Sequence, residues 1–134
     1  MPAGSRPRIT FAIVAAVLAA TAAIAHAAAT NVTQITNLSA SPKRFCAKAS
    51  DSCAGSGTTI RFRIGTPAKV LGHIRPRKNL KGGYRVVARR FPAGTNTFRI
   101  TETRLTTGRW TINLQAVNSV GAGPPATLDV QVVK

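Results

Sequence analysis

Apolar and polar residues alternate one by one along RWTINLQAVN, residues 109–118, and this alternation constrains the fold more than any other feature of the sequence. Successive side chains of an extended chain point to opposite faces. Trp110, Ile112 and Leu114 therefore fall on one face, and polar residues occupy the other. The pattern predicts a β-strand that buries one face in a hydrophobic core and leaves the other face in water.

Shorter segments of the same kind recur along the chain and are separated by turns rich in glycine and proline. The further strands that we expect are an edge strand at 35–41 and strands at 58–64, 68–75, 84–91, 95–101 and 126–133. After residue 27, apolar residues do not recur at helical spacing over any long stretch. A short chain with this rhythm predicts an all-β fold, a two-sheet sandwich of about seven strands.

The alternation also predicts which side chains fill the core between the two sheets and which point to solvent. The predicted core residues are Ile60, Phe62, Ile64, Phe98, Trp110, Ile112, Leu114 and Val130. Basic residues occupy many of the alternating positions. We expect them to face solvent, with Arg61, Arg63 and Arg99 on one sheet and Lys69, Arg75, Arg85 and Arg89 on the other.

Before the expected strands, the chain carries the three parts of a secretory signal peptide in order. Residues 1–8 are basic, residues 9–25 form an apolar run without charge, and residues 25–27 read Ala-His-Ala, a site of the kind that signal peptidase cleaves. We predict a signal-peptide helix over 1–27 with cleavage near Ala27. An uncleaved membrane anchor is the alternative, although the run is slightly shorter than the ~20 residues that span a bilayer.

Either outcome places the rest of the chain outside the cytoplasm, secreted or in the cell envelope. The membrane is then contacted only transiently, through the signal peptide, unless that segment stays uncleaved. Residues 28–134 are enough for one domain with its own core. Within it, we expect 28–57 to supply the edge strand and a loop with both cysteines, and 58–134 to supply the remainder of the sandwich.

Cys46 and Cys53, in the stretch FCAKASDSC, are the two cysteines of the chain. A metal site, a redox couple and a disulfide are the three uses that a pair can have. Redox couples favour a Cys-x-x-Cys spacing, and zinc needs more ligands than this pair supplies. Outside the cytoplasm, the pair predicts a disulfide that contributes ~2–2.5 kcal/mol in the chain-entropy model. We expect Phe45 beside it to pack at the end of the core.

Positive charge is the strongest remaining feature, because 19 Lys and Arg residues stand against three acids. Without Arg6 and Arg8 of the signal segment, the formal charge is about +14. Such a chain attracts anionic polymers and surfaces, with an affinity that falls with salt. The densest basic segment is 75–85, and the residues that we predict to bind anions there are Arg75, Arg77, Lys78, Lys81 and Arg85.

A solvated charged hairpin without a ligand is the alternative interpretation of that segment. We expect no specific recognition of nucleic acid, because the positive charge is spread over both sheets. The aromatic residues are also expected in the core, where they cannot form a platform on which bases stack.

Catalytic and metal-binding residues are scarce. After residue 27 the single histidine is His73, at an outward strand position, and the acids Asp51, Glu102 and Asp129 are far apart in sequence. A hydrolytic triad needs a nucleophile, a base and an acid within hydrogen-bond reach, and a zinc site needs a tetrahedral set of ligands. We therefore expect no catalytic residues, no metal and no cofactor, and we expect that the protein is not an enzyme.

Three segments carry a resemblance to a known family. LQAVNSVGAGPP, residues 114–125, resembles the end of the sixth strand and the following loop of fibronectin type III modules. RLTTGRWTIN, residues 104–113, is similar to the lead-in of that strand in bacterial immunoglobulin-like domains, and GTTIRFRIGTPAKV, residues 57–70, is similar to a second-strand pattern of repetitive secreted actinobacterial proteins. The resemblance implies an immunoglobulin-like or fibronectin type III-like sandwich.

The chain departs from the family pattern at two positions and lacks one motif. Trp110 stands where the family usually has a tyrosine whose hydroxyl bonds to the backbone, so the indole N–H needs another acceptor. The buried tryptophan of the family's second strand is missing, with Phe62 or Ile60 in its place, and no Arg-Gly-Asp sequence occurs.

Two functions remain open from the sequence. The first is a secreted, non-catalytic structural or interaction module of the cell envelope or extracellular space, with an unidentified protein or an anionic envelope polymer as its partner. The second is a cationic polyanion binder, which would hold a wall polymer, an anionic surface or extracellular nucleic acid through the loop 75–85. Fold alone does not decide between them.

Overall fold

The computed structural model describes residues 31–134 except 51, 54 and 80, and the predicted signal peptide lies outside these residues. The regular elements of this part of the chain are all β-strands. They are β1 (Ile35–Ser41), β2 (Arg44–Cys46), β3 (Thr58–Ile64), β4 (Ala68–Pro76), β5 (Tyr84–Phe91), β6 (Gly94–Ile100), β7 (Gly108–Val117) and β8 (Ala126–Val133). Among the described residues, no helix long and apolar enough to cross a membrane is found.

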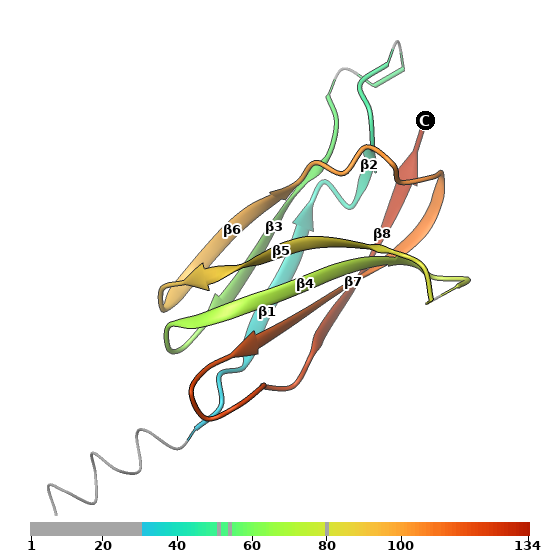
Figure 1. The fold of residues 1–134 in the computed structure, drawn as a ribbon. Helices are drawn as coiled ribbons and strands as arrows, with labels where there is room; N and C mark the ends of the chain where they lie inside the picture. The colour runs from blue at the N-terminus through green and yellow to red at the C-terminus, as the bar shows by residue number, and fades with distance from the viewer. Residues whose placement is uncertain (1–30, 51, 54, 80) are drawn as a thin grey trace, which may run out of the picture. The chain divides into compact units, whose positions relative to one another are not determined.

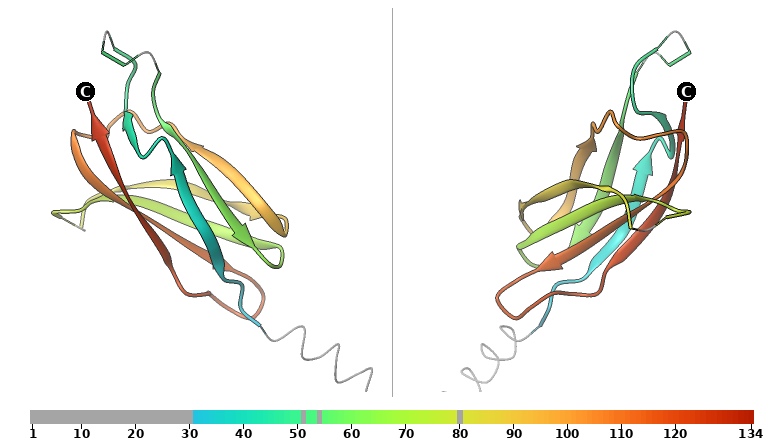
Figure 2. Two further views of the ribbon diagram at one scale, coloured as in Figure 1. Left: turned by 180° about the vertical axis from the view of Figure 1, so that it is seen from behind. Right: turned by 45° about the vertical axis from the view of Figure 1, so that its right-hand side comes forward.

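The strands form two sheets that face each other, as Figures 1 and 2 show. One sheet has three strands in the order β1-β3-β6, and the other has five in the order β2-β8-β7-β4-β5. Neighbouring strands are antiparallel except for β2 and β8, which are parallel. This arrangement confirms the all-β prediction and has the layers of a sandwich.

Strand β2 is the element that the sequence did not predict. It comprises three residues, Arg44–Cys46, and pairs with the last strand of the chain through Arg44 opposite Gln131 and Phe45 opposite Val132. Three residues are too few to show an alternating pattern, so periodicity could not identify it. The described part of the chain therefore has eight strands where about seven were expected.

The core lies between the sheets and is filled from both of them. Each of the eight side chains that the sequence placed there is buried, with an exposed fraction of 7% or less. Phe62 on β3 is fully buried and makes edge-to-face contacts with Phe91 and Phe98, at ring-centroid distances of 5.0 and 6.1 Å. Such aromatic pairs contribute beyond the area that they bury.

An irregularity in β5 reverses the expected direction of one arginine. Gly72 lies opposite Val87, but the next residue of β4, His73, lies opposite Arg85, so Val86 is an extra residue. A bulge of this kind shifts the alternation of a strand by one position. Arg89 is exposed as predicted, but it does not share a face with Arg85: it lies on the same face of β5 as Phe91 and places its guanidinium 4.6 Å from that ring's centroid.

The loop between β6 and β7 is held at one end of the sandwich by Trp110. Its indole N–H donates a hydrogen bond of 2.8 Å to the carbonyl of Thr106, four residues upstream, so the donor has the partner that a buried indole needs. The Tyr84 ring stacks on Trp110 at 6.3 Å, and the Arg104 guanidinium lies 4.3 Å from the centroid of Tyr84. Arg104 also forms an ion pair with Glu102.

Candidate anion-binding surface

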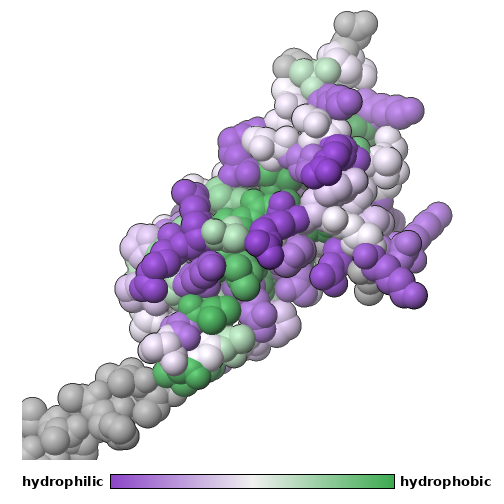
Figure 3. Space-filling model, in the orientation of Figure 1, coloured by the Kyte–Doolittle hydropathy of each residue, from purple (hydrophilic) through white to green (hydrophobic). Residues whose placement is uncertain are grey.

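The five basic residues predicted to bind anions lie on the hairpin of β4 and β5, and all five are exposed. The turn between the strands is ordered by backbone hydrogen bonds from Asn79 to Pro76 and from Gly82 to Asn79. The Asn79 side chain also accepts a bond of 3.1 Å from the Lys81 backbone N–H. Figure 3 shows strongly hydrophilic side chains projecting where this hairpin lies in Figure 1.

The hairpin does not bring the five residues to a single point. Arg85 lies directly opposite His73, and Arg75 is two residues further along β4, so these three side chains share the outer face of the five-stranded sheet. Arg77 lies further along the same outer face, where its backbone N–H donates to the Arg109 carbonyl at 3.1 Å and its guanidinium lies 3.2 Å from a carboxylate oxygen of Asp129. Arg77 is thus held toward β7 and β8, whereas Arg75 and Arg85 flank His73.

Arg77, the residue that follows β4, begins a row of side chains that crosses three strands. Its backbone bond places it beside Arg109 of β7, Arg109 lies opposite Gln131 of β8, and Gln131 lies opposite Arg44 of β2. Arg77, Arg109 and Arg44, which we call the arginine row, are all exposed. Together with Lys43 they line a shallow hollow of about 300 Å³ on the outer face of the sheet.

Asp129 is the acid within that hollow, and it is already engaged. One carboxylate oxygen accepts a hydrogen bond of 2.9 Å from the Thr111 hydroxyl, and the other faces the Arg77 guanidinium. Both side chains of the ion pair are about half exposed, at 52% and 54%, so the pair contributes little to stability. Its effect is to offset part of the Arg77 charge at the hollow.

Basic residues also cover the three-stranded sheet, as the sequence led us to expect. Arg61, Arg63 and Arg99 are exposed on β3 and β6. Arg99 donates hydrogen bonds to the Ser56 carbonyl at 2.6 Å and to the Thr59 hydroxyl at 3.2 Å, so its position is fixed by neutral partners. Both outer faces of the sandwich are therefore cationic.

The acids and the histidine lie apart in the described part of the chain. Glu102 is bound by Arg104 through side-chain and backbone hydrogen bonds, which lower the pKa of its carboxyl group to about 2. Asp51, the third acid, lies outside the described residues. Within residues 31–134, apart from the three that are not described, His, Cys, Asp and Glu side chains do not gather in groups of three that could hold a metal ion.

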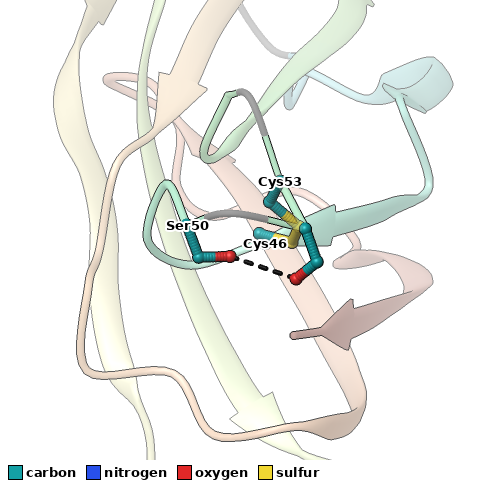
Figure 4. The surroundings of a disulfide bond; sticks show 4 residues. Cys46, Ser50 and Cys53 are labelled. Carbon is teal, nitrogen blue, oxygen red and sulfur yellow. Dashed lines mark hydrogen bonds between the residues drawn. A yellow bond between two sulfur atoms is a disulfide. The ribbon is translucent and has the colours of Figure 1, made fainter.

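Cys46 and Cys53 form a disulfide, with their Cα atoms 6.3 Å apart, which confirms that prediction. Inside the loop that it closes, Ser50 and Cys53 exchange two backbone hydrogen bonds of 2.9 and 3.0 Å, and Figure 4 shows the three residues together. Cys46 and Phe45 are both 4% exposed, and Phe45 belongs to the core. The bridge thus ties an exposed loop to the end of the core.

His73 provides a test of the electrostatic environment on the outer face. Burial, followed by the charges of Arg75 and Arg85, lowers its pKa below the ordinary value of 6.5. Asn113 of β7, a neutral residue, lies opposite His73 on its other side. The unfolded chain, with an ordinary pKa, therefore takes up a proton more readily than the folded one as the pH falls.

We expect the free energy of unfolding to decrease as the pH falls from 7 through 6.5 toward 5, and part of this decrease to disappear in His73→Gln. Urea unfolding of both proteins at pH 7 and pH 5 measures the difference. An identical pH dependence in the two proteins would show that folding does not lower the pKa of His73.

Comparison with known protein families, curated proteins and solved structures finds no significant match to this chain.

Proposed function

We propose that the protein is a secreted, non-catalytic interaction module of the cell envelope or extracellular space, built as an immunoglobulin-like or fibronectin type III-like sandwich. The order of the strands supports this fold. Consecutive strands pass repeatedly from one sheet to the other, and a three-stranded sheet faces a larger one, as in sandwiches of this class.

The contact made by Trp110 supports the same proposal. In the family that the sequence resembles, a tyrosine near the start of the corresponding strand bonds to the backbone a few residues upstream. Here the Trp110 N–H donates to the Thr106 carbonyl four residues upstream, at the corner between β6 and β7. An indole thus performs the contact that a phenol performs in the family.

Export is supported by the disulfide, because disulfides persist in oxidising compartments outside the cytosol. Fractionation of the cells that make the protein tests this part of the proposal. We expect the chain in the medium or the envelope fraction, with Ala28 as its first residue and with no free thiol. A chain that starts at Met1 and stays in the cytosolic fraction would contradict it.

A second candidate function is favoured by the cationic outer faces. The arginine row and the pair of Arg75 and Arg85 present guanidinium groups, which bind phosphate and carboxylate groups with two parallel hydrogen bonds. The described ion pairs engage two basic residues, Arg77 and Arg104. We therefore propose that the partner of the module is a polyanion, such as an anionic polymer of the envelope.

Retention on an anionic column tests the hairpin as the site of binding. The variant with Arg75, Arg77, Lys78 and Lys81 changed to Glu is expected to elute at a clearly lower salt concentration than the unmodified protein. Unchanged elution would remove the hairpin from the site. A partner that stays bound at all salt concentrations would remove the polyanion as the ligand.

A further inference from the structure

We infer that the arginine row, Arg77, Arg109 and Arg44, is the principal ligand site and that it binds the phosphate groups of a linear polymer without bases. This inference rests on the proposed polyanion binding and makes its location and its ligand specific. Only Arg77 of the row belongs to the basic segment that is visible in the sequence.

The backbone determines the spacing of the row. Adjacent strands lie about 5 Å apart, so Arg77 and Arg109 on neighbouring chain segments are separated by about one such step, and Arg109 and Arg44 by about two, or 10 Å. The row therefore runs across the strands, perpendicular to them. A flexible chain of phosphates laid along it can meet successive guanidinium groups without bending the protein.

Neutral polar groups lie within the row and beside it. The Gln131 amide lies between Arg109 and Arg44, and a second groove adjoins the hollow and shares Arg77 and Arg109 with it. That groove, of about 620 Å³, is also lined by Lys78 and by Thr106 and Thr107. Hydroxyl and amide groups can bond to the oxygen atoms of a polyol or a phosphate.

The aromatic residues argue against a ligand that is read by its bases. Trp110 lies against the groove but is 4% exposed, its ring is stacked with Tyr84, and its N–H is engaged by the Thr106 carbonyl. Single-stranded nucleic acid is held by exposed aromatic rings on which bases stack. A phosphate chain without bases needs only guanidinium, hydroxyl and amide groups, which this face presents.

Two pairs of variants with matched charge test the site, with long-chain inorganic polyphosphate as the probe. Arg44→Gln combined with Arg109→Gln removes two charges from the row, and Arg61→Gln combined with Arg63→Gln removes two from the other sheet. At low salt we expect the first variant to bind about tenfold more weakly and the second to change less than threefold. The negative slope of log affinity against log salt should become shallower by roughly 1.4 in the first variant, because two phosphate contacts are lost.

Removing the acid from the hollow, instead of its arginines, is expected to raise the affinity for polyphosphate. Asp129→Asn removes the acid from the hollow and releases Arg77, whereas Glu102→Gln removes an acid paired with Arg104 outside it. The two variants add the same charge to the protein. We expect Asp129→Asn to bind polyphosphate about threefold more tightly and Glu102→Gln to leave the affinity nearly unchanged. This test keeps the row intact, so it does not depend on how the arginine variants fold.

The possible results distinguish a wrong location of the site from an absence of polyanion binding. Equal losses in both arginine variants would overturn the row as the site and leave general polyanion binding in place. No binding of polyphosphate by the unmodified protein at low salt would overturn both. Tighter binding of single-stranded DNA than of polyphosphate, at equal phosphate concentration, would overturn the choice of a ligand without bases.

Discussion

Replacing Phe62 by alanine is expected to lower the free energy of unfolding by about 3–5 kcal/mol, the largest effect among the substitutions considered. Phe62 is fully buried in the middle strand of the three-stranded sheet. Its ring contacts Phe91 and Phe98, which come from the edge strands of the two sheets. The truncation therefore opens a cavity between the layers and removes two aromatic contacts.

Urea or guanidinium unfolding of Phe62→Ala beside Arg61→Ala measures this effect with a control on the same strand. Arg61 precedes Phe62 and faces solvent, so its substitution should change the free energy of unfolding by about 0.5 kcal/mol or less. A loss below 1 kcal/mol for Phe62→Ala would show that the two sheets do not enclose this ring.

Breaking the disulfide is expected to produce the second largest loss of stability, ~2–2.5 kcal/mol, because the bridge limits the freedom of the unfolded chain over the loop that it closes. The disulfide is attached to β2, which has few backbone contacts of its own. Strand β2 has three residues and pairs only with β8 in the five-stranded sheet. Phe45 at its centre is buried, so fraying of this strand would expose an aromatic side chain of the core.

The double variant Cys46→Ala, Cys53→Ala and the reduced unmodified protein should lose the same stability in denaturant unfolding. Agreement between them assigns the loss to the bond and not to the two side chains. If reduction leaves the free energy of unfolding unchanged, the loop is held by its other contacts, among them the hydrogen bonds between Ser50 and Cys53.

Most of the strands could be predicted because their sequences carry the information locally. The segment Thr58–Ile64 alternates residue by residue, and the structure buries Thr58, Ile60, Phe62 and Ile64 as this pattern requires. The extra residue in β5 could not be predicted, because a bulge is defined by the register of two strands and not by the sequence of one. Arg89 therefore lies on the face opposite to the one expected.

Part of the candidate site could also be predicted from neighbouring residues in the sequence, and part depends on strands that are distant in the sequence. The basic hairpin is contiguous in the sequence, so counting charges was enough to find Arg75, Arg77 and Arg85. Arg44 and Arg109 lie outside the basic segment 75–85 and are 65 positions apart in the sequence. They come into one row with Arg77 only because β2 and β7 both pair with β8, and the parallel pairing of β2 had no signal in the sequence.

The salt dependence of polyphosphate affinity tests most directly whether the cationic surface of this protein binds linear polyanions. Titrations of the purified protein over a series of salt concentrations give log affinity against log salt. Three to four phosphate contacts predict a straight line with a slope of roughly −2 to −3, at about −0.7 for each contact. A slope near zero, or no binding at the lowest salt concentration, would show that the cationic surface does not bind linear polyanions.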